Sequence, residues 1–526
     1  MSPLVPLSLW TMAIVASAAP PKAPFKVLFG HDTTCITSCV SPWRPKGGRL
    51  TDEQVRASID EIVGADAILF QPGCGWIPWW KSKVYPAEEH YRFYQERYGI
   101  KPNTFGAYML GGGDLLKTFT ARCRERGVAA FVSYRMNDGH GLENAGLTNA
   151  SAAHTVSRFY LENYQRWRIG PDPKDWNQRV LDWAVPEVRD HKFAFIREIC
   201  ESYDIDGMEL DFMRHPSYFR PGFPEAERRE IMTAFVGRVR EVLDHSSPPG
   251  GRRWLCVRLP ASVAGQMGLG LDAARLAAAG VDMFNLSCHY FTMQQSDVAR
   301  VRGLVPGAAI YLEMTHTTGT GPSLGAGYDN FAFRRTTEQQ YATTAHLAYG
   351  QGADGMSLFN FVYYREHGGA GRGPFNEPPF GILPHLTDRA WLAAQPQWYF
   401  VAREWQGAEP IPRACSRKLA AGQSTRFEVD VAPGEGRTKD GALRLMVSGA
   451  KPGRQWRVTF NGTALSPTDF VAKPLDHPYD ADVGKSGQYA CFALPRAAVR
   501  TGPNEVEVLL EKGPTANVQY ADFVLP

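Results

Sequence analysis

The chain has 526 residues, of which 44% are hydrophobic and 21% are charged, and its formal net charge is +3. This length is too great for one ordinary domain and suits two or three. The composition is that of a globular protein. The small net charge gives no strong field directed at nucleic acid or at an anionic membrane surface, so we expect no nucleic-acid partner.

The N-terminal stretch MSPLVPLSLWTMAIVASAAPPK has the features of an export signal. Residues 4–15 are mostly apolar, and residues 16–18 supply the small side chains typical of a cleavage site. The apolar stretch is short for a membrane span and contains Pro6. The sequence therefore predicts a signal peptide over residues 1–18 and a secreted or periplasmic protein without a membrane span after cleavage. An uncleaved anchor is the alternative.

Eight short β-type runs come next along the chain, and helical patterns lie between them. The runs are 25–32, 65–73, 128–135, 205–212, 253–262, 281–290, 308–316 and 353–361. Apolar strands that alternate with helices indicate a parallel sheet covered on both faces. Eight such units predict an α/β fold, a closed (β/α)8 TIM barrel over residues 22–405. A doubly wound open sheet is the alternative. The largest insertion lies at about 136–190, and its segment NYQRWRIGPDPKDWNQ, residues 163–178, is expected to form a loop over one rim.

The fourth run lies within YDIDGMELDFMRHP, residues 203–216, and carries two carboxylates in an apolar setting. Glu209 and Asp211 share parity, so both are expected to point into the barrel near its C-terminal mouth, where the catalytic groups of this fold occur. Asp206 and Gly207 would begin the strand at the opposite end. Structural ion pairs are an alternative role for both carboxylates, because an unpaired buried carboxylate is very costly. The arginines considered as partners are Arg135, Arg214 and Arg258.

Polar and aromatic side chains follow the ends of nearly all the runs. We expect the substrate-binding groups among His31, Asp32, Trp76, Tyr134, Arg135, Asn137, His140, Arg214, His215, Arg258, Asn285, His289, Tyr290, His316 and Asn360. Any one of these residues could be a polar rim residue whose hydrogen bonds are all made within the protein. Together, however, they form a ring of groups suited to binding a sugar. The excess of Arg and His also predicts a substrate that carries negative charge.

Glu313, at the end of the seventh run, is the remaining carboxylate of interest. Glycoside cleavage needs two carboxyl groups, about 5–5.5 Å apart in retaining enzymes and about 6.5–9.5 Å apart in inverting ones. The fourth and seventh strands lie on opposite sides of the mouth, so Asp211 and Glu313 are the predicted catalytic pair. Glu209 with Asp211 is the rival pair, although neighbours on one strand would flank a bond less well.

The string DGMELDFMRHP, residues 206–216, resembles the fourth strand of bacterial glycoside-hydrolase-like barrel families, where an Asp-Gly pair leads through two acidic positions into Arg-His-Pro or Arg-Tyr-Pro. The order of the barrel agrees over about 380 residues. The resemblance implies polysaccharide hydrolysis, with Asp211 in the position of the strand-end Asp. Chitinase-like families share part of the motif, but Glu209 replaces one Asp and Met213 stands where their acidic Glu would be. Their substrate-assisted mechanism is therefore not carried over.

Beyond about residue 405 the apolar residues alternate with period two, between turns rich in Gly, Pro and Asn. This pattern predicts a small all-β jelly-roll sandwich over residues 412–526. VTFNGTAL and GPNEVEVLL resemble the galactose-binding-like sandwiches attached to many sugar-degrading enzymes. The segment has no cluster of acids at strand ends, so we expect an accessory domain without catalytic groups.

Together these features predict an exported glycoside hydrolase that acts on a poly- or oligosaccharide and needs no cofactor. A non-catalytic carbohydrate-binding barrel that has lost hydrolytic activity is the alternative. A metal-dependent hydrolase would need clustered ligands such as His-x-His at a strand end. The first run offers only His31 and Asp32, so no metal is expected.

Overall fold

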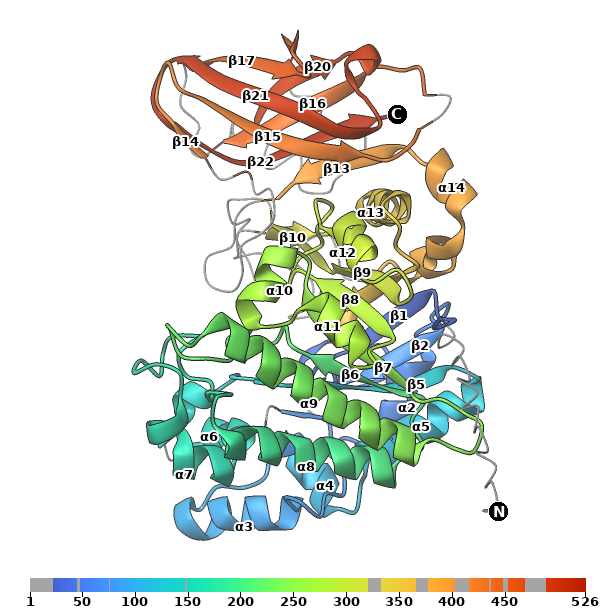
Figure 1. The fold of residues 1–526 in the computed structure, drawn as a ribbon, viewed down its shortest axis with the longest axis vertical. Helices are drawn as coiled ribbons and strands as arrows, with labels where there is room; N and C mark the ends of the chain where they lie inside the picture. Colours follow the sequence, from blue (N-terminus) through green and yellow to red (C-terminus); the bar gives the residue numbers. More distant parts are fainter. Residues whose placement is uncertain are drawn as a thin grey trace, which may run out of the picture.

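The computed structural model of the protein describes two parts, a barrel surrounded by helices and a β-sandwich, which lies above the barrel in Figure 1. The described residues are 22–44, 48–74, 76–146, 149–319, 333–365, 377–402, 415, 417–434, 437–447, 453–468 and 489–526. The expected signal peptide and the expected boundary between the two domains, at 405–412, lie outside these residues.

Eight parallel strands close into a barrel in the order β1-β12-β9-β8-β7-β6-β5-β2. They are β1 (Val27–His31), β2 (Ala67–Phe70), β5 (Ala129–Arg135), β6 (Gly207–Asp211), β7 (Trp254–Pro260), β8 (Met283–Ser287), β9 (Ala309–Thr315) and β12 (Gly355–Phe359). Each strand falls inside the run expected for it. Because β1 pairs with both β2 and β12, the sheet has no open edge, and the TIM-barrel prediction is confirmed.

Most of the helices lie around the outside of the barrel (Figure 1). The helices of the described ranges are α1 (Cys35–Ser38), α2 (Asp52–Asp60), α3 (Ala87–Tyr98), α4 (Thr104–Leu110), α5 (Leu115–Arg126), α6 (Ala150–Thr155), α7 (Arg158–Trp167), α8 (Pro186–Ser202), α9 (Glu225–Ser246), α10 (Val263–Leu269), α11 (Ala273–Ala278), α12 (Val298–Leu304), α13 (Glu338–Gly350) and α14 (Arg389–Ala394). Within the described ranges, none of them is long and apolar enough to cross a membrane.

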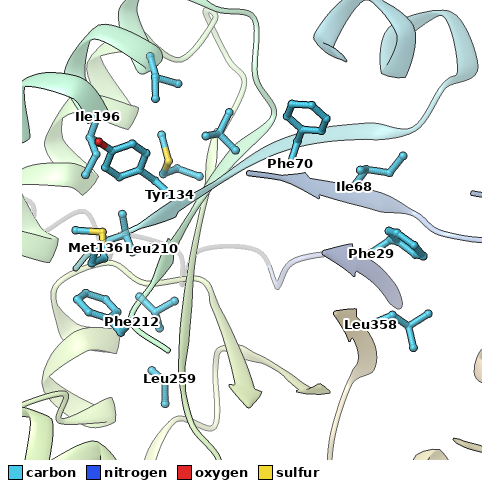
Figure 2. Packing of buried hydrophobic residues seen from close by; sticks show 14 of the residues in the cluster. Phe29, Ile68, Phe70, Tyr134, Met136, Ile196, Leu210, Phe212, Leu259 and Leu358 are labelled. Atoms are coloured by element: carbon cyan, nitrogen blue, oxygen red, sulfur yellow. The ribbon is translucent and has the colours of Figure 1, made fainter. Parts of the chain in front are cut away.

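Alternate strand residues face the helices or the lumen, as the period of a β-strand requires. Figure 2 shows the outer set, in which Phe29, Ile68 and Leu210 belong to the large buried cluster between strands and helices. The inner set is apolar at the bottom of the barrel, where Phe131 and Tyr311 are buried. A Cβ atom at Gly207 would lie 2.2 Å from the Phe131 ring, so this glycine gives the ring its space.

The same hydrogen bond occurs at the N-terminal ends of four barrel strands. An Asp just before the strand accepts a backbone N–H from a neighbouring strand of the barrel. The pairs are Val27 N with Asp66 at 2.9 Å, Ala130 N with Asp206 at 2.7 Å, Leu255 N with Asp282 at 2.9 Å, and Ile310 N with Asp354 at 2.9 Å. Asp206 is thus part of the bottom of the barrel, as expected, and the acids of the mouth are a separate set.

Two antiparallel sheets form the C-terminal part, one of six strands and one of four. The strands are β13 (Gln397–Val401), β14 (Arg417–Leu419), β15 (Ser424–Val431), β16 (Gly441–Val447), β17 (Gln455–Phe460), β18 (Thr463–Ala464), β19 (Ser466–Thr468), β20 (Tyr489–Leu494), β21 (Gly502–Lys512) and β22 (Ala516–Leu525). Apolar residues of both sheets share one buried core, as in a β-sandwich. The first strand, β13, pairs with β22, so this part begins before residue 405.

The sandwich is joined to the barrel through the segment that follows β8. The buried amide of Gln294 donates to Trp398 O and accepts from Phe400 N, both at 2.8 Å, and so pairs with β13 as a neighbouring strand would. Gln295 accepts from Asp430 N at 2.8 Å. The same segment carries His289 and Tyr290, so the sandwich contacts a loop of the barrel mouth.

Candidate active site

A four-residue cluster fills the lumen just below the mouth. Arg258 donates to both oxygens of Glu313 at 2.6 Å, to Asp211 Oδ1 at 2.9 Å and to Ser287 at 3.0 Å. All four side chains are buried. Burial opposes the charge of Arg258, but Asp211 and Glu313 outweigh it and raise its pKa above the ordinary value. Asp211 and Glu313 thus contact the same guanidinium group, which lies between them.

The two carboxylates of this cluster differ in how fully they are bound. Glu313 Oε1 accepts from Arg258 and Ser287, and Oε2 accepts from Arg258 and, at 3.5 Å, from Asn285. Asp211 accepts from Arg258 and from Met213 N, and both bonds go to Oδ1. In the described part of the chain, Asp211 Oδ2 therefore has no hydrogen-bond donor, whereas Glu313 is saturated.

Glu209 lies one layer deeper than Asp211. It accepts from Ser133 at 2.7 Å, from Asn285 at 2.9 Å and from Cys256 Sγ at 3.6 Å. Burial, and next the charge of Asp211, raise the pKa of Glu209 from 4.5 to about 7. This carboxyl therefore carries a proton over much of the neutral range, which limits the negative charge of the lumen.

A second charged cluster lies above the first. Arg135 donates to Asp32 at 2.8 Å and to Asp138 at 3.1 Å. Burial alone would raise the pKa of Asp32, but Arg135 and Arg214 outweigh it and hold the pKa below its usual range. Despite burial, contacts with His140 and Arg135 likewise keep the pKa of Asp138 well below its ordinary value. Both carboxylates are ionised and bound to protein donors.

Two histidines border this cluster, and their partners fix their proton positions. Gly139 N donates to His215 Nδ1 at 2.9 Å, so the proton of the neutral ring is on Nε2. Arg214 Nη2 donates to His140 Nε2 at 3.1 Å, and the other nitrogen of His140 contacts Asp138. Burial lowers the pKa of His140, and it lowers the pKa of His215 further, with a contribution from His140. Both rings are neutral at neutral pH.

Three of the expected site residues adopt a left-handed backbone conformation. The φ angles are 58° for His215, 58° for His289 and 54° for Asn360, and in the described chain only Asn461 shares this feature among residues other than glycine. Each of the three follows the C-terminal end of a barrel strand. Such conformations cost about 1–3 kcal/mol each and cluster at functional sites. The strain at the mouth therefore supports a functional role for this end of the barrel.

Some expected residues do not face the mouth, and these expectations are corrected. His31 faces α2, where it contacts Ser58 at 3.1 Å, because it shares parity with the outward-facing Phe29. Tyr134 also points outward and packs against Phe195. Trp76 is buried, and its ring lies 3.8 Å from Lys192 Nζ, so neither face is open to a sugar.

The remaining expected residues occupy the mouth or its supports. Asn137 donates to Leu181 O and Ser217 O and so fastens two loops. His316 is buried beside the Tyr363 ring. Tyr290 is partly exposed, with its ring 4.8 Å from the guanidinium carbon of Arg214.

Trp176 belongs to the site but was not expected there. It lies in the large insertion, stacks on His215 with ring centroids 3.7 Å apart, and also contacts His140 and His289 edge-on. Residues 163–178 were expected to form a loop over one rim; the segment begins inside α7, which ends at Trp167, and Trp176 lies after the helix, against the histidines of the mouth. The sequence shows that this segment is rich in aromatic residues, since Tyr164 and Trp167 precede Trp176. It does not show which of these rings turns toward the mouth.

Asp138, His140 and His215 have ligand-type atoms within 4.8 Å of one another, a spacing that a metal ion could bridge. The hydrogen bonds already described argue against this use. His215 Nδ1 accepts from a backbone N–H, and the guanidinium of Arg214 lies against His140, where it would repel a cation. We therefore assign these residues to the hydrogen-bond network of the mouth.

No protein-family model matches the sequence. No curated protein matches it either. Solved structures that resemble this chain are glycoside hydrolases, at low identity. The Group IV chitinase of Ostrinia furnacalis is 13% identical, with 70% of this chain and 98% of that chain covered and a TM-score of 0.38. An alpha-amylase from Geobacillus thermoleovorans is 14% identical over 93% and 99%, with a TM-score of 0.37.

A third similar structure is alpha-L-fucosidase isoenzyme 1 from Paenibacillus thiaminolyticus, which is 12% identical over 93% of this chain and 97% of that chain, with a TM-score of 0.34. At these identities and TM-scores the likeness assigns no activity to the chain. The closed strand order and the two sheets define the class: a (β/α)8 barrel followed by a β-sandwich.

Proposed function

We propose that this protein is a glycoside hydrolase that cleaves a poly- or oligosaccharide at the C-terminal mouth of its barrel. The observation that carries the proposal is the state of Asp211. Among the lumen and mouth carboxylates described above, it is the one with an oxygen, Oδ2, that no protein donor occupies. A positioned carboxylate with a free oxygen is what a nucleophile or a general base needs.

The partner acid of Asp211 is assigned to Glu313, on β9, three strands away from β6 in the barrel. One guanidinium contacts both groups, so the two carboxyls lie within the spacing that glycoside hydrolysis uses, no more than about 9.5 Å. In the arrangement described, Glu313 cannot exchange a proton with a substrate unless Arg258 first moves away. The proposal therefore requires Arg258 to exchange Glu313 for the substrate when the mouth is occupied.

The saturation of Glu313 also favours a second candidate, a barrel that binds carbohydrate without cleaving it. Arg258 then serves as a permanent counter-charge for both carboxylates. The two candidates share a ligand and differ in turnover.

The test measures hydrolysis of a polysaccharide panel by the full chain and by Asp211→Asn, with binding of the same polymers followed by affinity electrophoresis. Hydrolysis by the wild type that falls at least about 100-fold in Asp211→Asn, with binding retained, is the expected result. Binding by both proteins without any product would establish the non-catalytic candidate instead. Glu313→Gln tests whether Glu313 is a catalytic acid or only an ion-pair partner of Arg258. Near-wild-type turnover in that variant would remove Glu313 from the catalytic pair.

Export is part of the proposal and is based on the apolar stretch at residues 4–15 and the small residues that follow it. N-terminal sequencing of the protein recovered outside the cytoplasm is expected to start just after residue 18. An intact N-terminus on a membrane-bound product would contradict cleavage.

A further inference from the structure

Arg214 is the least neutralised of the three arginines at the mouth. Arg258 and Arg135 each hydrogen-bond two carboxylates. Arg214 is 3% exposed, and its contact with a carboxylate is at 4.0 Å, to Asp32, which already accepts from Arg135. Its one hydrogen bond among the described residues goes to the neutral ring of His140. A buried cation in this state lacks a full counter-charge.

Arg214 leaves two N–H donors open, and the residue that follows it, His215, has a further open donor. The Nε and Nη1 atoms of Arg214 are buried without a hydrogen-bond partner, and so is Nε2 of His215. Since Gly139 fixes the proton of His215 on Nε2, all three atoms are N–H donors. A buried donor without an acceptor is destabilising, so such groups are normally completed by water, an ion or a ligand.

Aromatic rings next to Arg214 limit the directions from which an acceptor can reach its open N–H donors. Its guanidinium carbon lies 4.8 Å from the centre of the Tyr290 ring and 5.5 Å from that of Phe359. Ring contacts of this kind stabilise the cation but accept no conventional hydrogen bond. The acceptor must therefore approach in the plane of the guanidinium, where the Nε–H and Nη1–H bonds of Arg214 point outward and can be donated to the oxygens of an oxyanion.

We propose that Arg214, with His215, binds an anionic substituent of the sugar substrate, a carboxylate or a sulfate ester. The inference rests on the proposed function for the nature of the ligand, because it places the anion on a carbohydrate. Several open N–H donors on a cation and on the residue that follows it suit an oxyanion, which offers two or more oxygens, better than a hydroxyl, which offers one. Trp176, stacked on His215, provides an aromatic surface next to this subsite.

The experiment is a calorimetric titration of the full-length protein with matched sugars. The pairs are glucuronate with glucose, and N-acetylglucosamine 6-sulfate with N-acetylglucosamine; inorganic sulfate alone distinguishes a free anion from one borne by a sugar. The wild type is expected to bind at least one anionic sugar about 10-fold or more tightly than its neutral counterpart, the effect of a charge-assisted hydrogen-bond pair. Equal binding within both pairs would overturn the proposal.

Arg214→Gln is expected to lose that preference and to keep its binding of the neutral sugar. Arg238→Gln is the matched control, since Arg238 also stacks on a ring, that of Phe193 at 4.0 Å, but its salt-bridge partner is Asp190, on α8. A preference that persists in Arg214→Gln would assign the anion to other residues and refute the subsite. If Arg214→Gln does not fold, Arg214→Lys replaces it; retention of the full preference there would refute the role of the guanidinium N–H donors.

These titrations do not depend on turnover, so the two proposals can fail separately. Anion preference without hydrolysis of any polymer would refute the glycoside hydrolase and leave the subsite in place. Hydrolysis that needs Asp211, together with equal binding of charged and neutral sugars, would do the reverse.

Discussion

Glu209 gives the most direct test of how the lumen is charged. The carboxyl is 2% exposed, and its pKa is raised from 4.5 to about 7 by burial and by Asp211. A difference of this size corresponds to about 3 kcal/mol in the free energy of unfolding. Because the pKa is raised on folding, this contribution is fully present below about pH 4.5 and is lost as the pH rises through about 7.

The perturbation is Glu209→Gln, a neutral side chain of the same shape. Its amide oxygen can accept from Asn285, and its amide N–H can donate to Ser133, whose hydroxyl is able to reverse its role. The variant therefore keeps the hydrogen bonds of the protonated acid and cannot ionise. We expect the wild type to lose about 3 kcal/mol relative to the variant between about pH 4.5 and about pH 8.5.

The assay is urea unfolding followed by tryptophan fluorescence, at several values of pH across this window, with the difference between variant and wild type as the measured quantity. Asp211→Asn is the internal comparison: removing that charge should lower the pKa of Glu209, so this variant should lose less stability with rising pH. If Glu209→Gln retains the full pH dependence of the wild type, Glu209 is not the group that titrates, and the assignment of its proton is wrong.

Three further substitutions test other contacts of the mouth. Arg258→Met leaves two buried carboxylates without their cation and should destabilise the protein by about 3–5 kcal/mol in denaturant unfolding, whereas the exposed pair of Arg238 should change stability by less than about 1 kcal/mol in Arg238→Met. Comparable losses in the two variants would contradict the central position of Arg258. Gln294→Ala removes the two buried hydrogen bonds to Trp398 O and Phe400 N of β13 and should cost about 2–4 kcal/mol. Hydrogen exchange should then speed up in residues 288–297, and unchanged protection there would show that the sandwich does not hold this loop. Trp176→Ala removes the ring stacked on His215 and should weaken sugar binding by about 10-fold, seen as a higher KM with little change in kcat; an unchanged KM would exclude contact with substrate.

The sequence by itself determined the barrel and the position of its main carboxylates. Eight apolar runs separated by helical patterns leave few alternatives to a closed parallel sheet, because every strand is buried on both faces. The period of two also fixes which side chains face inward, and it predicts the shared orientation of Glu209 and Asp211. The same rule, applied from Phe29 and Val132, excludes His31 and Tyr134 from the lumen.

Only the tertiary structure decided how the charges of the mouth are paired. Asp211, Arg258 and Glu313 come from three different strands, and closure of the barrel brings one guanidinium between two carboxylates. Sequence spacing gives the height of each group on its strand, but not the path of a long flexible side chain across the lumen. The inward turn of Trp176 depends in the same way on the packing of an insertion against the rim. The position and orientation of strand residues were therefore predictable, because the backbone geometry of a strand leaves few alternatives. The partners of the long side chains were decided by packing and by the need to neutralise buried charge.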